Sequence, residues 1–140
     1  MPATNYGMAE ILQAFFGTQV TVPTTWYVGL ATTVFTSETI DGSDCNEVSG
    51  GSYARESITN NAGDNTDWVT AAHDSILTSN QAAITFTESS AIWDTVTTVF
   101  LADASTDGNI YFYTNITPTL YVGTDTIISW AANTLQVTMS

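Results

Sequence analysis

VTTVFLADASTDGNIYFYT, residues 96–114, is the stretch that decides the fold of this chain. Its first part, 96–102, is a nearly continuous run of apolar and β-branched residues, which is typical of a strand at the centre of a sheet. Residues 103–109 are mostly small or polar and favour a turn, and residues 110–114 resume a strand pattern rich in aromatic residues. The stretch therefore predicts a hairpin whose first strand crosses the middle of a sheet.

Shorter strands and loops are expected on both sides of this hairpin. Five further segments have strand character: 26–32, 53–59, 82–86, 126–130 and 135–139. Two polar, glycine-bearing stretches are expected to be loops: 37–52 and 60–67. The last two strands, joined by residues 131–134, predict a second hairpin. Gly29 lies on a small-residue face, where another backbone is expected to approach.

The beginning of the chain predicts one amphipathic helix over Asn5–Phe16. Apolar residues recur there at helical spacing, namely Met8, Ile11, Leu12 and Phe15. Thr4 or Asn5 can cap the start of this helix, and Gly17 can end it. One helix followed by about seven or eight short strands predicts a mainly β protein, a single-domain β-sandwich or jelly roll over residues 1–140.

The charge of the chain restricts its partners. Arg55 is the one residue in the Lys and Arg class, against 14 acids, and the formal net charge is −13. Proteins that bind nucleic acid or anionic membranes need clusters of basic residues to replace displaced counterions. We therefore expect no nucleic-acid partner and no membrane partner, and no run of about 18 apolar residues predicts a membrane span. A secretion signal is not expected either.

The acidic composition also has a physical cost. A charge of −13 on so small a body makes the compact state repel itself, and salt screens that repulsion. A salty setting would suit the chain, and ordinary acidic solubility explains the charge equally well. Because lysine is absent, Schiff-base lysines and paired cationic clamps are absent too.

Two acidic loops offer the oxygen ligands that calcium prefers. They contribute Asp41, Asp44, Asn46 and Glu47 in one loop, and Asp64, Asn65 and Asp67 in the other. Neither loop has the spacing of a defined calcium-binding loop, so solvated carboxylates are the favoured interpretation. Paired carboxylates of a glycosidase are a remote alternative, because these acids lie in polar turns and not at apolar sites that would raise a pKa.

The remaining reactive side chains lack partners for catalysis. His73 is the one histidine, and no second histidine or thiolate is positioned to share a metal with it. Ser52 follows two glycines without forming a nucleophile elbow, so it is expected in a turn. Cys45 is the single cysteine and is expected to be a small spectator. We therefore predict no catalytic residue, cofactor site or metal site, and hence no enzyme.

Aromatic residues allow two interpretations. The set comprises Trp26, Trp68, Trp93, Trp130, Tyr111 and Tyr113. On one exposed face they would form a sugar-binding platform, but their place in or beside alternating strands favours core packing and subunit contact. The tripeptide from Asn115 matches a glycosylation acceptor, which means little without a secretion signal.

Arg55 is expected to have a structural role. It follows an acidic loop and lies between Tyr53 and Glu56 at the start of a strand. The favoured partner is a carboxylate that binds the guanidinium with two hydrogen bonds and fixes the loop to the strand. We therefore predict a structural ion pair at Arg55.

Nearly the whole sequence resembles a group of small tailed-phage virion proteins, often labelled tail fibre proteins and including jelly-roll capsid decoration proteins. The residues that carry the resemblance are Phe15-Phe16-Gly17, Trp26 to Thr33, Glu47 to Arg55, Ile92 to Thr97, Gly108-Asn109-Ile110, Gly123 to Thr126 and Leu135 to Thr138. Glu47 to Arg55 is the most specific of them. Two departures are Glu56, where similar sequences are apolar, and Thr124, which lengthens a turn.

The resemblance implies a non-enzymatic structural role on a virion. It does not separate two uses. The short chain has no coiled-coil stalk and no collagen-like repeat, which favours a capsid decoration (cement) protein, a homotrimer bound to the major capsid protein on the exterior of the capsid and assembled in the host cytoplasm. The alternative is a tail fibre or tail-tip module that joins tail proteins and binds a host receptor or glycan. A hydrolase built on loop carboxylates is a remote third hypothesis.

Overall fold

The predicted hairpin forms the centre of the fold in the computed structural model, which describes residues 1–17, 20–36, 41–60, 68 and 77–138. Strand β5 (Asp94–Ala102) pairs antiparallel with β6 (Ile110–Val122), as the sequence predicted. β6 continues far beyond residue 114, where its sequence pattern was expected to end. The pairing register between β5 and β6 shifts between Val96 and Thr98, opposite the part of β6 that contains Pro118. Proline cannot donate a hydrogen bond to the neighbouring strand, so the regular ladder is interrupted there.

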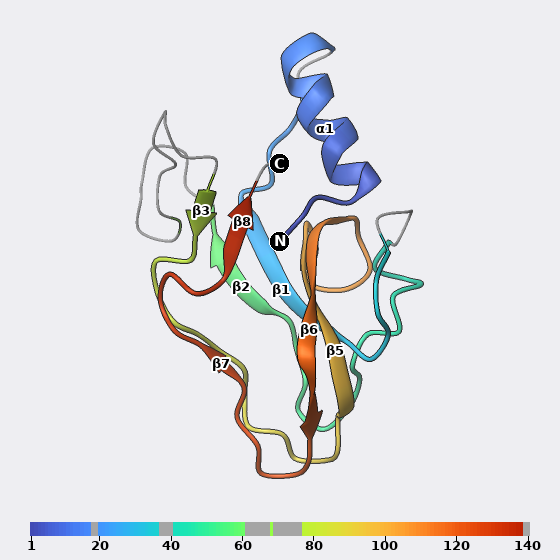
Figure 1. The fold of residues 1–140 in the computed structure, drawn as a ribbon, viewed down its shortest axis with the longest axis vertical. Coiled ribbons are helices and arrows are strands. Elements are labelled where there is room, and N and C mark those ends of the chain that lie inside the picture. The colour runs from blue at the N-terminus through green and yellow to red at the C-terminus, as the bar shows by residue number, and fades with distance from the viewer. Residues whose placement is uncertain (18–19, 37–40, 61–67, 69–76, 139–140) are drawn as a thin grey trace.

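Two strands on the other side of β5 complete a four-stranded antiparallel sheet in the order β2-β1-β5-β6 (Figure 1). They are β1 (Thr25–Ala31) and β2 (Glu56–Thr59), so the second predicted strand begins at Glu56 and not at Tyr53. Gly29 of β1 lies opposite Phe100 of β5, and the Phe100 ring fills the space that a side chain at Gly29 would take. The expectation of a backbone at Gly29 is wrong, because an aromatic ring approaches there instead.

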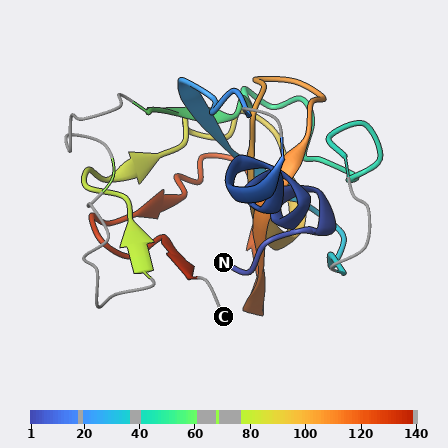
Figure 2. The same ribbon diagram turned by 90° about the horizontal axis from the view of Figure 1, so that it is seen from above.

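Two small sheets form the second layer of the molecule. β3 (Leu77–Ser79) pairs with β8 (Gln136–Thr138), and β4 (Ile84–Thr85) pairs with β7 (Ser129–Trp130). In Figure 2 these strands, yellow-green and red, lie together on one side of the orange β5–β6 hairpin. The fold is therefore the predicted mainly β sandwich with one N-terminal helix.

The predicted hairpin between 126–130 and 135–139 is wrong, because β7 and β8 pair with β4 and β3 and not with each other. Asn80 gives the physical reason. Its side-chain amide donates hydrogen bonds to the carbonyls of Ala82 and Ala131, and its Oδ1 accepts one from the Leu135 N–H. The segment after β7 therefore wraps around a buried asparagine from another part of the chain.

Both faces of the four-stranded sheet are covered. One core cluster lies between the layers and contains, among others, Val28, Leu30, Val99, Leu101, Ile84, Phe86, Leu135 and Val137. The other lies on the opposite face of the sheet, where Phe35 and Cys45 pack against Phe100 and Tyr113. Alternating residues of β5 point into the two clusters, which explains its nearly continuous apolar sequence.

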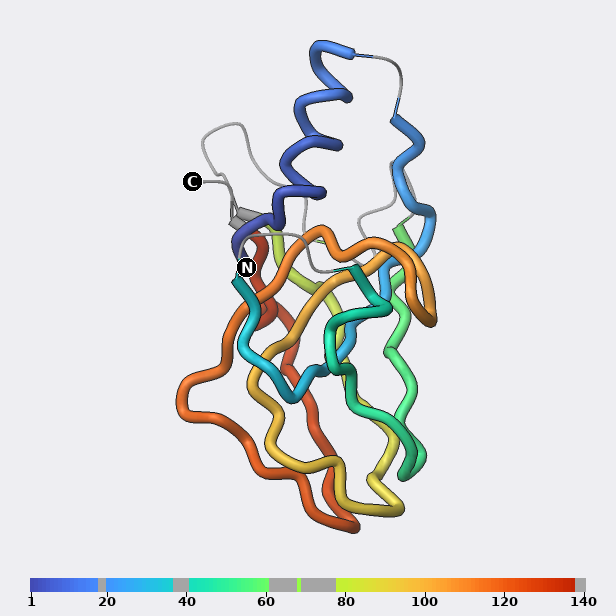
Figure 3. The backbone as a smooth tube through the Cα atoms, turned by 90° about the vertical axis from the view of Figure 1, so that its right-hand side faces the viewer, coloured from blue at the N-terminus to red at the C-terminus, as the bar shows by residue number. Residues whose placement is uncertain are grey.

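The predicted helix is confirmed as α1 (Asn5–Phe16), with Thr4 accepting a hydrogen bond from the Gly7 N–H at 3.0 Å and Gly17 at its end. Its base is fixed to β6, because the Thr4 hydroxyl donates to the Ile110 carbonyl and Gly7 packs on the Tyr111 carbonyl. From there the helix extends away from the sandwich (Figures 1 and 3). Within the described ranges, no helix has the length and apolar character needed to cross a bilayer.

Candidate functional site

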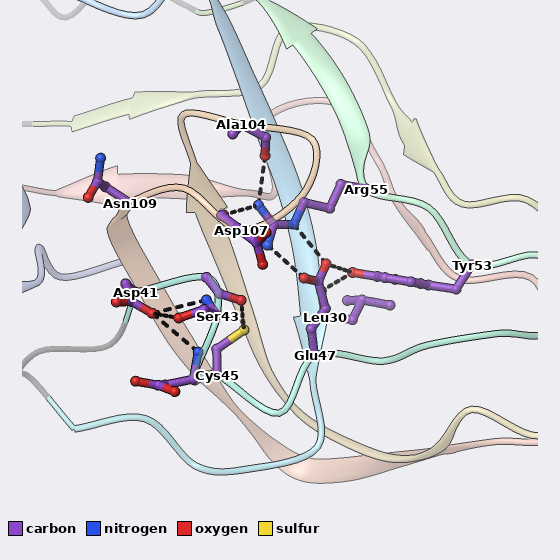
Figure 4. A network of polar contacts seen from close by, with 12 residues as sticks. Leu30, Asp41, Ser43, Cys45, Glu47, Tyr53, Arg55, Ala104, Asp107 and Asn109 are labelled. Carbon is purple, nitrogen blue, oxygen red and sulfur yellow. Dashed lines mark hydrogen bonds and ion pairs between the residues drawn. The ribbon is translucent and has the colours of Figure 1, made fainter.

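Arg55 forms a two-pronged ion pair with Glu47, drawn in Figure 4. Its Nε donates to Glu47 Oε1 at 2.7 Å, and its Nη2 donates to Glu47 Oε2 at 2.6 Å. The Arg55 side chain is only 1% exposed and that of Glu47 19% exposed. The pair joins the loop before Val48 to the residue that directly precedes β2, which is the loop-to-strand connection expected from the sequence.

The same guanidinium also holds the loop between β5 and β6. Its Nη1 donates to the carbonyls of Ala104 and Asp107 at 2.6 and 2.9 Å. The guanidinium carbon lies 5.0 Å from the centre of the Phe100 ring, a distance at which cation and ring attract each other. One side chain therefore connects two loops and the central strand.

Tyr53 extends this connection to β1. Its hydroxyl donates to Glu47 Oε1 at 2.7 Å and accepts a hydrogen bond from the Leu30 N–H at 2.8 Å. Burial raises the pKa of Tyr53 well above its usual range, and the charge of Glu47 raises it further. Burial lowers the pKa of Arg55, but hydrogen bonds and charge from Glu47 outweigh that effect and raise it.

We call Arg55, Glu47, Tyr53 and the two accepting carbonyls the Arg55 network. Every nitrogen of the guanidinium donates a hydrogen bond within the chain. The side chain is enclosed, so the strongest cation of the molecule faces other parts of its own fold and not the solvent. This geometry is that of a structural clamp between segments distant in sequence.

The carboxylates of the first acidic loop do not converge. Asp41 Oδ1 accepts hydrogen bonds from the Ser43 N–H and hydroxyl and from the Asp44 N–H, and the bonds from Ser43 lower the pKa of Asp41. Glu47 is engaged by Arg55. Among residues that the structure describes, no three His, Cys, Asp or Glu side chains gather as metal ligands would. Asp64, Asn65, Asp67 and His73 lie outside the described residues.

Three other residues from the sequence patterns are engaged locally. Ser52 has a positive φ of 65° and its hydroxyl donates to Ser90 Oγ at 2.8 Å, as expected of a turn residue. Cys45 is buried, and burial raises the pKa of its thiol to about 11. Asn115 binds the Phe35 backbone through both its amide nitrogen and its oxygen, so this amide is not free to carry a glycan.

The aromatic residues pack largely inside the molecule. Trp93, Tyr111 and Tyr113 are buried, and three others are half-buried against the core: Trp26, Trp68 and Trp130. Ring contacts link them to neighbours, for example Trp26 edge-on to Tyr111 at 4.9 Å between centroids. Core packing, the favoured interpretation, therefore describes these rings better than an exposed sugar-binding platform.

Two exposed apolar surfaces were not predicted as sites. The first lies on α1 and comprises Met8, Leu12, Phe15 and Phe16, which we call the helix surface. The second group consists of Ile92, Leu120, Tyr121 and Ile127, from the segments before β5, at the end of β6 and before β7. The helical spacing of the first group was visible in the sequence, but spacing alone does not distinguish a face buried in the chain from one left open.

Two hollows lie beside Trp26 and Phe112. The smaller, of about 140 Å³, is almost wholly apolar and is lined by Glu10, Ile11, Ala14, Val20, Val22, Pro23, Trp26, Tyr111 and Phe112. We call it the phenyl-sized hollow. The larger, of about 240 Å³, includes Trp68, whose buried Nε1 has no hydrogen-bond partner.

Comparison with known proteins gives one family. Residues 2–138 match the family model Gp80, described as podophage GP4 fiber I protein gp80. The curated proteins compared with the chain include no match.

Proposed function

The chain belongs to the family of podophage GP4 fiber I protein gp80, and from this membership we propose that it serves as a module of a virion fibre. The family makes it a phage virion structural protein. The observation that carries the proposal is the extent of the match, because residues 2–138 include nearly every part of the sandwich and its helix. A fibre module acts by binding, and we propose that it catalyses no reaction.

The chemistry of the chain supports a binding role. Its one arginine is enclosed within the Arg55 network, so it is not available to a substrate. The exposed apolar side chains of the helix surface offer a contact area of the kind that binds a partner. We propose that it works on the exterior of the virion as a homotrimer, with a host receptor or glycan as the outer partner and tail proteins as the inner one.

Capsid decoration is the second candidate. Here the protein would be a cement protein bound to the major capsid protein on the outside of the head, a role that suits a short chain without a coiled-coil stalk or collagen-like repeat. Both candidates share the virion and the β-sandwich, and they differ in where copies of the chain sit on the particle.

Electron cryo-microscopy of intact particles labelled with an antibody against the chain separates the two candidates. The fibre proposal expects density and label at the tail, and label distributed over the head would replace it with decoration. A second measurement adds purified protein to host cells before infection. A fibre module that touches the host reduces phage adsorption, whereas the same protein unfolded by heat does not.

A further inference from the structure

The helix surface is unusually apolar for a side that faces solvent. The exposed fractions are 52% for Met8, 58% for Leu12, 78% for Phe15 and 87% for Phe16. These positions are spaced i, i+4, i+7 and i+8, so they form one stripe along the helix. A stripe of this kind in a soluble protein marks a surface that binds something.

The phenyl-sized hollow lies on a different side of the same helix. Ile11 and Ala14 line it, together with residues from the sandwich, and Phe15 and Phe16 do not. Its volume of about 140 Å³ is close to that of an apolar cavity of about 150 Å³ that binds benzene. Each copy of the chain therefore carries exposed phenyl rings on one side and space for such a ring on another.

The charge distribution allows two copies to meet here. Of the 14 acids, Glu10 alone lies within residues 1–37, which supply the helix surface and most of the hollow. A basic partner would find little negative charge on this part of the chain to attract it. Contact between copies brings few acids together locally, although the remaining charge of each copy opposes it over longer distances.

The exposed apolar area approaches what such a contact needs. Each aromatic side chain offers on the order of 150–250 Å² for burial, so the two rings of the copy that supplies them contribute roughly 300 Å² or more to one contact. The partner surface loses a similar area, and Met8 and Leu12 add to it. The total comes within reach of the roughly 1,000 Å² that a specific interface needs.

We propose that a second copy of this chain covers the helix surface, with Phe15 or Phe16 of one copy seated in the phenyl-sized hollow of the next. Because ring and hollow lie on different sides of α1, the contact is head-to-tail. A head-to-tail contact forms a ring where the rotation between copies closes, and a filament where it does not. The inference rests on the proposed function only for the number of copies, since it assigns an interface to the proposed homotrimer.

Two variants of the full chain test the contact from its two sides. Phe15→Ser with Phe16→Ser removes the rings and keeps the hollow, whereas Ala14→Trp fills the hollow and keeps the rings. By sedimentation, each is expected to dissociate at least about tenfold more readily than the unmodified chain. Mixed together, the two variants are expected to form heterodimers, because one supplies the ring and the other the hollow. Circular dichroism and thermal melting show whether each variant is folded.

The matched control is Tyr121→Ser with Ile127→Ser, which removes exposed apolar area elsewhere and should leave association unchanged. Salt gives a further readout: it should strengthen contact between acidic copies, whereas it would weaken binding to a basic partner. If the unmodified chain forms oligomers and both variants do too, the inference fails while the trimer stands. If the unmodified chain stays monomeric at high concentration and high salt, the proposed contact and the proposed trimer both fail. The proposal that the chain is a fibre module is tested separately, by its position on the virion.

Discussion

At the scale of single residues, the Arg55 network should contribute strongly to stability. Arg55→Ala leaves Glu47 partly buried without its cation, and breaking such a pair costs about 3–5 kcal/mol. We expect the melting temperature to fall by roughly 10 °C or more. Denaturant unfolding of Arg55→Ala, Glu47→Gln and the double variant gives the coupling energy. A coupling near zero would show that the two side chains are merely neighbours.

Arg55 also shows how far the sequence leads at this scale. Its flanking residues and the preceding acidic loop were enough to predict a carboxylate partner reached by two hydrogen bonds. The carbonyls of Ala104 and Asp107 were not predictable, because they come from a loop about 50 residues away that only the β5–β6 hairpin brings close. Glu47 could not be told from the other acids of its loop, because the sequence does not show which carboxylate the loop turns towards Arg55.

The thiol of Cys45 should be inert in the folded protein. The side chain is 1% exposed, and burial raises its pKa to about 11, so little thiolate exists near neutral pH. We expect a thiol-specific disulfide reagent at pH 8 to label native protein far more slowly than protein in denaturant. Fast labelling of the native chain, with circular dichroism unchanged, would contradict this placement.

Alkaline pH should destabilise the protein through the enclosed side chains of Cys45 and Tyr53. The pKa values of Cys45 and Tyr53 are raised by folding above ordinary values of 9.0 and 10.0, so both groups stay neutral in the native state. Stability is therefore fully present below the unfolded values and is lost as pH rises above about 9 to 10. Melting temperatures from pH 7 to 11 measure the fall. Cys45→Ala removes the group with the lower pKa, so the fall in melting temperature should begin at a higher pH in this variant. A melting temperature that does not change with pH would contradict the assignment of these two groups.

At the scale of elements, Asn80 should hold the second layer together. It is 1% exposed, and its side chain makes the three hydrogen bonds that connect it to residues 82, 131 and 135. Asn80→Ala leaves the N–H of buried Leu135 without its acceptor, at about 1–3 kcal/mol for an unsatisfied buried group. Hydrogen exchange should show lost protection at Leu135, while β5 keeps its protection. Gln136→Ala, an exposed neighbour, should change neither.

The strands differ in how well the sequence predicts them. β5 was predictable because its long apolar run is buried on both faces, and a tight polar turn then fixes its partner. β7 and β8 were assigned to each other because only a short polar segment separates them. Their true partners are selected by Asn80, a single buried polar residue that periodicity cannot reveal. Helix α1 was predicted in place, but the exposure of its apolar face, which depends on how the described residues pack, could not be read from its spacing.

At the scale of the whole molecule, the charge of −13 should make stability depend on salt. Exposed acids repel one another over about 30 Å at 0.01 M salt and about 8 Å at 0.15 M, so added salt relieves the folded state most. We expect the melting temperature to rise by several degrees between these concentrations. The Arg55–Glu47 pair opposes this trend little, because it is enclosed and poorly screened.

The choice of salt separates screening from specific binding. Sodium chloride and choline chloride at equal ionic strength should raise the melting temperature equally if screening is the cause. Calcium chloride at matched ionic strength should then add nothing, because Asp41 is engaged by Ser43 and Glu47 by Arg55. An additional rise with calcium that saturates at low concentration would instead indicate an ordered cation. In that case the acidic loops would serve the virion protein as ligands and not only as a solvated surface.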